Sequence, residues 1–328
     1  MTDPILEIAD LHVEFKTYEG PLKVLNGVSM SVQPGRRVGL VGEAGCGKTT
    51  TMRCVLGILP NPPGKITKGS IHFHGQDLLH FSKREFQRIR GHGISMIFQD
   101  PTAALNPVFT VGDQLETAIR YGSKQTASRK EIRHRALKAL SEVQLPDTER
   151  ILTCFPVELS GGMRQRVCIA MALATEPELL IADEPTTSLD VTIQDQILRL
   201  LYDLVENHGT AVIFITHSLG VVREMADEVY VMYAGNIVEG ASKDELFHAP
   251  LHPYTQGLMS AVPKLTGGGV AEGIPGRIPE YISPPGGCRF HPRCTRAMSR
   301  CAGECPQFVT IHPSHQVACF LHSGESHG

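Results

Sequence analysis

The sequence lacks the features of an exported or membrane-spanning chain. No apolar run approaches the roughly 18 residues that a membrane span needs, and residues 1–10 contain no basic stretch followed by an apolar core, which a secretory leader requires. The net charge of -3 over 328 residues gives no electrostatic attraction to nucleic acid or acidic lipid. We therefore expect a globular cytoplasmic protein without a nucleic-acid partner.

A glycine-rich stretch lies between an apolar run at residues 38–41, which predicts a buried strand, and residues 50–58, which predict a helix. This is the P-loop pattern in its expected setting. Its glycines let backbone N–H groups and a helix N-terminus face a polyphosphate, Lys48 reaches the β- and γ-phosphates, and Thr49 offers a hydroxyl to Mg²⁺. The stretch, which predicts nucleotide binding, reads Gly42-Glu43-Ala44-Gly45-Cys46-Gly47-Lys48-Thr49-Thr50.

Two acidic residues end a second apolar strand. Residues 179–182 are wholly apolar and run directly into Asp183 and Glu184. In P-loop proteins an acid at this point holds Mg²⁺ opposite the P-loop hydroxyl, here Thr49. Glu184 is then placed to orient or deprotonate a water that attacks the γ-phosphate. An apolar run that ends in one acid is weak evidence, but two acids downstream of a P-loop predict a hydrolytic site.

Further polar residues occur at the ends of strands or the start of a helix. Gln99 ends the strand predicted at residues 94–98, and His217 follows the one at residues 211–215. Ser160, Gly161 and Gly162 open an alanine-rich helix, so they expose backbone donors at a second anion-binding end. Phe15 ends, and Tyr18 follows, the first of two alternating, antiparallel strands, predicted at residues 5–15 and 24–32. Either aromatic ring could stack on a base, and either could equally be a core residue.

In their order, these motifs resemble the ATP-binding cassettes of ABC transporters, with Ser188 to Asp190 as the D-loop. The resemblance implies an α/β P-loop NTPase cassette over residues 1–240, with an antiparallel β subdomain and a helical insert at about 100–165. It also implies that two cassettes dimerise head to tail, so that Ser160 to Gly162 of one close on the ATP of the other. The second cassette can be identical or a related chain.

The resemblance continues past the cassette. Residues 251–256 and 286–294 are similar to the C-terminal extension of oligopeptide and dipeptide importer ATPases, a group that includes nickel importers. It implies a C-terminal extension over 241–328 and an ATPase subunit that powers peptide import through two membrane permease subunits. Such a subunit lies at the cytoplasmic face of the membrane and is served indirectly by an extracytoplasmic solute-binding protein.

Other functions remain open at this stage. Nickel or another small solute is an alternative cargo. A soluble ABC ATPase of translation or DNA repair is a weaker alternative, because such chains commonly carry two cassettes or a long coiled coil between motifs. A regulatory metal-binding module in which the cassette only senses nucleotide is a further alternative, and the presence of Asp183, Glu184 and His217 argues against it.

The family resemblance also implies a role for each residue of the site. It implies Lys48, Gln99, Glu184 and His217 as the catalytic set, and Thr49, Gln99 and Asp183 as the groups around Mg²⁺. Counting back from the P-loop, the resemblance implies that Phe15 stacks on the adenine, with Tyr18 as the reserve. A separate hypothesis concerns Cys46, whose position at a helix N-terminus beside Lys48 favours a reactive thiolate.

Five of the nine cysteines crowd the end of the chain, at positions 288, 294, 301, 305 and 319. Only Cys301 and Cys305 have the close spacing of a structural zinc pair, whereas wider spacing suits a [4Fe-4S] cluster. Spacing alone leaves zinc and free thiols open. The resemblance implies Cys288, Cys294, Cys301 and Cys319 as cluster ligands. We expect the cluster to staple a tail rich in proline and glycine. Loss of the cluster would then unfold the residues beyond about Gly286 and leave ATP binding by the cassette intact.

Overall fold

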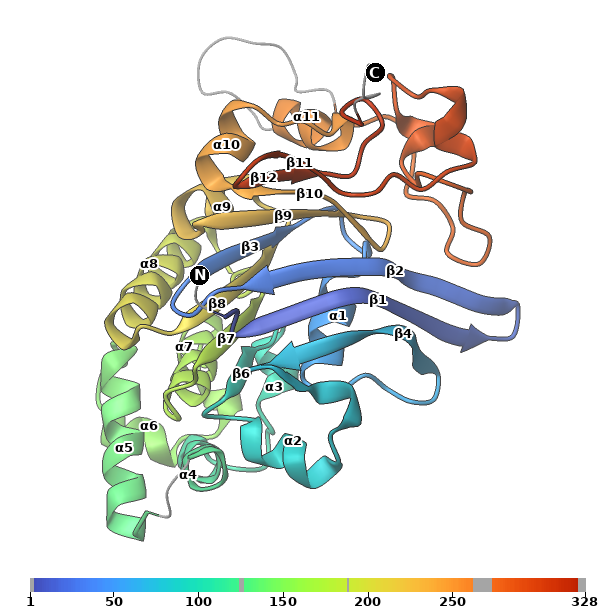
Figure 1. Ribbon diagram of the computed structural model, residues 1–328. Coiled ribbons are helices and arrows are strands. Elements are labelled where there is room, and N and C mark those ends of the chain that lie inside the picture. The colour runs from blue at the N-terminus through green and yellow to red at the C-terminus, as the bar shows by residue number, and fades with distance from the viewer. Residues whose placement is uncertain (1–2, 124–126, 188, 262–272, 324–328) are drawn as a thin grey trace. The chain divides into compact units, whose positions relative to one another are not determined.

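The computed structural model describes residues 3–123, 127–187, 189–261 and 273–323 (Figure 1). The chain divides into two compact units. One joins Met1–Val32, Arg37–Leu79 and Thr216–Gly328, and the other joins Gln33–Arg36 to His80–Ile215. The P-loop and the C-terminal extension therefore belong to the same unit.

The first unit contains an antiparallel sheet with the strand order β2-β1-β4-β5. Leu11 and Val13 of its first strand lie in the core and alternate with more exposed residues, as in an antiparallel sheet with one buried face. The strands predicted at 5–15 and 24–32 are confirmed. The sheet consists of β1 (Leu6–Thr17), β2 (Gly20–Val32), β4 (Gly64–Phe73) and β5 (Gln76–Asp77).

The same unit carries further strands in the order β11-β12-β10-β9-β3. Strand β3 pairs in parallel with β9, and the other neighbours are antiparallel. Val38, Leu40 and Val41 of β3 are all buried, which explains why the strand before the P-loop is apolar throughout. The strands are β3 (Arg37–Val41), β9 (Glu228–Tyr233), β10 (Asn236–Ser242), β11 (Val309–His312) and β12 (His315–Val317).

Helices and 3₁₀ turns complete the first unit. Helix α11 begins with Pro253 at its first turn, where the missing N–H costs nothing. The helical elements are α1 (Lys48–Val55), α9 (Leu219–Met225), α10 (Lys243–His248), α11 (Pro253–Ser260), η3 (His291–Arg293) and η4 (Ser299–Ala302).

The C-terminal extension, orange to red in Figure 1, adds strands to the sheet that leads into the P-loop. Strand β12 pairs with β10, with Glu239 opposite Val317. Phe290 of the extension packs its ring edge-on against Tyr233 of β9, with centroids 5.0 Å apart, and 5.4 Å from Tyr254. These rings share one hydrophobic core with Val41 and Val231. The extension is thus packed into the core around the P-loop strand.

The second unit contains parallel strands in the order β6-β7-β8, with helices packed on them. Every residue of β7 and β8 is buried, which matches the unbroken apolar runs in the sequence. The strands are β6 (Ile94–Ile97), β7 (Leu179–Asp183) and β8 (Ala211–Thr216).

The helical insert expected at about 100–165 is a set of capped helices. Thr110 caps α4 by accepting from the Asp113 N–H, while the Asp113 carboxylate accepts from Thr110. The helical elements that lie between β5 and β8 in the sequence are η1 (Leu78–His80), α2 (Lys83–Ile89), α3 (Pro101–Ala104), α4 (Val111–Gly122), α5 (Arg129–Glu142), α6 (Thr148–Thr153), η2 (Pro156–Glu158), α7 (Gly161–Leu173) and α8 (Val191–His208).

Candidate functional site

The glycine-rich loop curls between β3 and α1. Gly47 caps the helix with φ +111°, a left-handed conformation that side chains other than glycine rarely adopt. Helix α1 then begins at Lys48, so its first backbone N–H groups open toward the loop. Gly42, Cys46 and Lys48 are buried, whereas Ala44 and Gly45 are exposed. The loop thus places backbone donors at a helix N-terminus, the arrangement that binds phosphate groups in proteins.

The ammonium group of Lys48 lies over the same loop. Its Nζ donates to the carbonyl oxygens of Gly42 at 2.8 Å and of Glu43 at 3.0 Å. Only 5% of Lys48 is exposed. A buried ammonium that is held by loop carbonyls supplies a positive charge where the polyphosphate has to lie. Thr49 and Thr50 follow in the first turn of α1, half-buried.

Asp183 and Glu184 lie at the carboxyl end of β7, in the second unit. Asp183 is 2% exposed, and Glu184 is half-buried with φ +44°. The Glu184 N–H donates to the carbonyl of Ile215 at 2.9 Å, which ties the turn to β8. A left-handed conformation at a residue other than glycine is uncommon and occurs often at functional sites.

Gln99 follows the neighbouring strand β6, and its side chain reaches Glu184. Nε2 of Gln99 donates to Oε2 of Glu184 at 3.3 Å. The two residues are thus brought together within the second unit, as the parallel arrangement of β6 and β7 requires.

Thr187 is a residue of this site that the sequence did not single out. Its Oγ1 donates to the same Glu184 oxygen at 2.8 Å. Its place three residues after the acid was the available signal, because a turn after a strand end brings such a hydroxyl back to the carboxylate.

Ser160 is the N-cap of α7, where its hydroxyl accepts from the Met163 N–H at 3.3 Å. Ser160 is exposed, and Gly161 and Gly162 form the first turn of the helix. A second helix N-terminus with small residues is therefore open at the surface of the second unit, as the sequence predicts.

Two family profiles match this chain, one in the cassette and one in the C-terminal extension. A family profile described as "ABC transporter" matches residues 25–187. One described as "Oligopeptide/dipeptide transporter, C-terminal region" matches residues 238–301. The dipeptide transport ATP-binding protein DppD of Bacillus subtilis is 46% identical over 97% of this chain and 95% of its own length. The oligopeptide transport ATP-binding protein AppD of Bacillus subtilis is 44% identical over 98% of both chains.

This chain belongs to the ATP-binding proteins of ABC transporters. Among solved structures, the dimeric post-hydrolysis state of the cassette MJ0796, bound to ADP and phosphate, superposes with a TM-score of 0.65 at 27% identity. The superposition covers 73% of this chain and 98% of the MJ0796 cassette. The expected cassette fold and ATPase class are confirmed. Among the described residues, no helix combines the length and the apolar character that crossing a bilayer takes.

The remaining predicted nucleotide contacts of the cassette have different surroundings. Phe15 is half-buried on β1, paired with Leu22 on one side and Gly64 on the other. Tyr18 stands in the β1–β2 turn, fully exposed. His217 is exposed and follows β8 directly. Ser188 of the predicted D-loop lies outside the described residues.

The structure contradicts the hypothesis of a reactive Cys46 in the cassette. Cys46 is 0% exposed, and burial raises the pKa of its thiol even though the Lys48 ammonium, with Nζ 3.7 Å from Sγ, acts in the opposite direction. The helix N-terminus and Lys48 favour a thiolate, but the cost of desolvating a thiolate inside the loop is larger than their effect. Cys46 is a buried part of the P-loop, and its burial raises the pKa of the thiol and so disfavours the thiolate.

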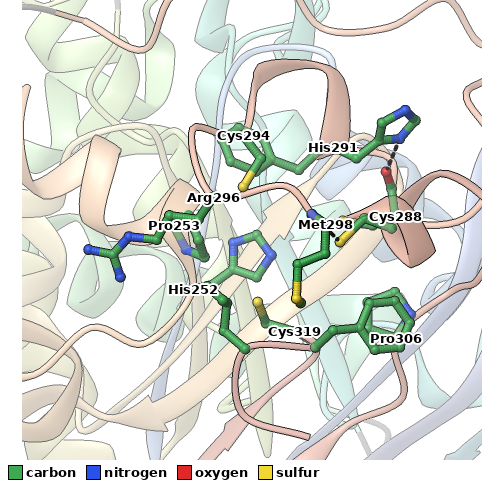
Figure 2. Close-up of a pocket in the computed structure, with 13 residues that line it drawn as sticks. His252, Pro253, Cys288, His291, Cys294, Arg296, Met298, Pro306 and Cys319 are labelled. Carbon is green, nitrogen blue, oxygen red and sulfur yellow. Dashed lines mark hydrogen bonds between the residues drawn. The ribbon is translucent and has the colours of Figure 1, made fainter.

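The four cysteines assigned to a cluster line one cavity of about 20 Å³ in the extension. Figure 2 shows Cys288, Cys294 and Cys319 pointing toward a common space, and Cys301 lines the same cavity. Burial raises the pKa of Cys288 to about 11, and the neighbouring cysteines act in the same direction. His252 lies beside them, and burial lowers its pKa to about 3, so it is neutral at pH 7.

Two observations bear on what this cavity can hold. None of the nine cysteines, which all lie in the described part of the chain, forms a disulfide. Across the described ranges, no group of three or more histidine, cysteine or acidic side chains is arranged to hold a metal ion. Cys305 is exposed and donates to the Gly287 carbonyl at 3.2 Å, outside the cavity. Four thiols line the cavity, which is the number of cysteine ligands that an iron–sulfur cluster takes, but in the described ranges they are not gathered into a metal-holding group.

Proposed function

We propose that this chain hydrolyses ATP to power the import of di- or oligopeptides through separate membrane subunits. The observation that carries this proposal is the match of residues 238–301 to the C-terminal region of oligopeptide and dipeptide transporters. It is supported by relatives that match the chain over almost its whole length and are themselves oligopeptide and dipeptide transport proteins. The cassette thus supplies the energy for transport, and other subunits select the cargo.

The ATP site is proposed to use the P-loop and the acids of β7. The backbone donors from Gly42 to Thr50 and the Lys48 ammonium bind the phosphates, supported by the burial and orientation of Lys48. Thr49, Asp183 and Gln99 are the residues that would hold Mg²⁺, which neutralises phosphate charge when bound. Phe15 stacks on the adenine, with Tyr18 as the alternative.

Glu184 is proposed to orient the attacking water and to accept its proton as oxygen attacks the γ-phosphate and ADP leaves. Gln99 and Thr187 position the carboxylate, supported by their hydrogen bonds to Oε2. His217 follows β8 as a γ-phosphate contact. These roles need only proton transfer and positioning, which is how phosphoryl transfer is generally catalysed.

A second ATPase subunit, identical or related, is proposed to complete the site. Ser160, Gly161 and Gly162 at the open start of α7 would contact ATP that is held by the partner's P-loop, while this chain's P-loop receives the partner's equivalent residues. The dimeric arrangement of the MJ0796 cassette supports this proposal.

We place the subunit at the cytoplasmic face of the membrane, bound to two transmembrane permease subunits and served indirectly by a solute-binding protein. We retain residues 1–240 as the nucleotide-binding domain, with a helical insert at about 100–165, and 241–328 as the extension. Strand β10 crosses that boundary and pairs with β12, so the extension is a continuation of the sheet.

We propose that Cys288, Cys294, Cys301 and Cys319 hold a [4Fe-4S] cluster. Their convergence on one cavity supports this, as does the exclusion of Cys305 from it. A single zinc ion draws its thiolates to within about 4 Å of one another, because each Zn–S bond is about 2.3 Å. A cube holds its thiolates farther apart, and across the described ranges the thiols are gathered for neither group. The cluster staples the extension and takes no part in hydrolysis.

The decisive experiment is purification of the native complex from gently solubilised membranes, followed by reconstitution into proteoliposomes. We expect two polytopic subunits to co-purify, and ATP to drive uptake of a labelled dipeptide. The Glu184→Gln variant is the matched control, and it should bind ATP without supporting uptake. ATP-driven uptake of nickel instead of peptide would overturn the cargo, and ribosomal or DNA-repair partners would overturn the transport function.

A further inference from the structure

The C-terminal extension makes direct hydrogen bonds to the P-loop. The hydroxyl of Tyr254 accepts from the Glu43 N–H at 3.0 Å, and the hydroxyl of Tyr281 donates to the Gly45 carbonyl at 2.8 Å. Arg293 donates to both oxygens of the Glu43 carboxylate, at 2.9 and 3.1 Å. Because Glu43 and Gly45 lie inside the phosphate-binding loop, the extension restrains the part of the cassette that meets the nucleotide.

Arg293 makes the strongest of these contacts. Its side chain is 7% exposed and that of Glu43 is 27% exposed, so the bidentate pair is shielded from water on the arginine side. The remaining guanidinium donors go to the carbonyls of Ile274 at 3.0 Å and Pro275 at 2.9 Å and to the hydroxyl of Tyr233 at 3.4 Å. The guanidinium carbon lies 5.6 Å from the centroid of the Tyr233 ring. A planar guanidinium group whose N–H groups donate on every side is held in one orientation.

Arg289 anchors the same segment from the other side. Its guanidinium donates to the carbonyls of Ala234 and Lys23, the latter at 3.0 Å. Ala234 precedes Gly235, whose N–H donates to the Cys46 carbonyl at 2.8 Å. The segment at residues 289–293 is therefore connected to the P-loop through Glu43 on one side and through the β9–β10 turn on the other.

We propose that Arg293 is a positioning residue for ATP binding and that the extension acts on the nucleotide site through it. This inference rests on the proposed nucleotide site at the P-loop. Lys48 donates to the carbonyl of Glu43, so a shift of Glu43 also displaces the ammonium that meets the phosphates. Arg293 also neutralises a carboxylate in the phosphate-binding loop. Without it, the Glu43 charge repels the incoming polyphosphate.

The test is equilibrium ATP binding and steady-state hydrolysis by the full-length chain with substitutions at this pair. We expect Arg293→Ala to raise the Kd and KM for ATP about tenfold, which lies in the usual range for the coupling between two sites. The kcat should change much less, because Glu184 is untouched. Arg293→Lys should lie between the parent and Arg293→Ala, since it keeps the charge but not the fork. Adding Glu43→Gln to Arg293→Ala should recover part of the affinity, because it removes the repelling charge.

Arg300→Ala is the matched control within the extension. Arg300 pairs with Glu304 at 3.2 Å and stacks on Phe320 with its guanidinium carbon 4.0 Å from the ring centroid. The Arg300→Ala variant loses these two contacts, so it tests whether loosening the extension is enough to weaken ATP binding. If Arg300→Ala raises the Kd as much as Arg293→Ala does, positioning through Glu43 is wrong. Tyr281→Phe removes only the hydroxyl bonded to Gly45, so it carries the test if Arg293→Ala does not fold, with a smaller rise in Kd expected.

Lys48→Ala separates failure of this inference from failure of the proposed site. Loss of ATP binding in Lys48→Ala together with parental affinity in Arg293→Ala and Tyr281→Phe would overturn the inference and leave the site standing. Parental ATP affinity in Lys48→Ala would overturn the proposed site, and the inference with it.

Discussion

The side-chain amide of Gln99 and the carboxylate of Glu184 meet over 3.3 Å, although 85 positions separate them in the sequence. The contact forms because β6 and β7 are parallel neighbours, so both residues emerge at the same edge of the strands. Thr187 donates to the same carboxylate oxygen at 2.8 Å. One oxygen of Glu184 is thus held by two donors, which sets the direction in which the carboxylate faces.

Glu184→Gln should abolish most turnover while leaving ATP bound. The amide is nearly the same size but cannot accept a proton from water, so we expect kcat to fall by about 10²- to 10⁴-fold, the usual contribution of a general base. Single-turnover hydrolysis and equilibrium ATP binding measure the two properties separately. Glu184→Asp is the control that keeps the charge and shortens the reach. Undiminished turnover in Glu184→Gln would contradict the assignment.

Thr187→Val should lower kcat without changing the KM for ATP. The substitution keeps the shape of the side chain and removes the hydroxyl that orients Glu184. We expect a loss of about three- to tenfold, the net contribution of one typical hydrogen bond. Thr187→Ser retains the hydroxyl and should restore the parental kcat. A change in KM alone would mean that Thr187 acts on binding instead.

Phe15→Ala should weaken ATP binding about tenfold if its ring stacks on the adenine, because such stacking is worth about 1–3 kcal/mol per base. Tyr18→Ala is the matched substitution at the reserve position, and we expect a smaller effect there. Inorganic tripolyphosphate has no base, so its binding should be the same in the parent and in Phe15→Ala. If tripolyphosphate binding also falls, Phe15 acts by packing between β2 and β4.

Alkylation of the native chain at pH 8 should label Cys305 well before Cys46, Cys54 and Cys168. Cys305 is exposed, whereas the other three are buried. Burial raises the pKa of Cys54 and of Cys168 to about 12, so almost no reactive thiolate forms at pH 8, and the rate should rise only as the pH approaches that value. Peptide mass spectrometry of a time course identifies the labelled residues, and Cys305→Ser removes the fast site. ATP-protected labelling of Cys46 as the first site would contradict its burial.

Cys288→Ser should lower the iron and sulfide content of anaerobically purified protein, whereas Cys305→Ser should not. Cys288 lines the cavity that contains the four converging thiols, and Cys305 lies outside it. Iron and acid-labile sulfide analysis measures the cluster, and limited proteolysis measures the loosening of the extension. Equal loss in both variants would argue against the assigned ligand set. Zinc in place of iron would overturn the cluster itself.

The residues of the P-loop and of the strand ends could be predicted from the sequence because local patterns define them. An apolar run, a glycine-rich turn and a helix place Lys48 without any knowledge of the rest of the chain, and the same holds for Asp183 after β7. Thr187 was missed because its one signal, a hydroxyl three residues after the acid, is common in turns and does not by itself indicate a contact with the carboxylate. The chemistry of Cys46 was misjudged because its burial depends on the surrounding packing and not on its neighbours in sequence.

The sequence by itself determined the ATP-binding character of the chain, the order of its catalytic motifs and its membership of a transporter family. Only the tertiary structure decided that the C-terminal extension is bonded to the phosphate-binding loop. From the sequence alone, unfolding of the tail beyond about Gly286 on loss of a cluster is expected to leave ATP binding intact, because nothing in the sequence connects that tail to the P-loop. Arg293 and Glu43 are 250 positions apart, and no local pattern links them. Their pairing follows from the shared core of Tyr233, Tyr254 and Phe290, because packing those rings together places the guanidinium beside the loop.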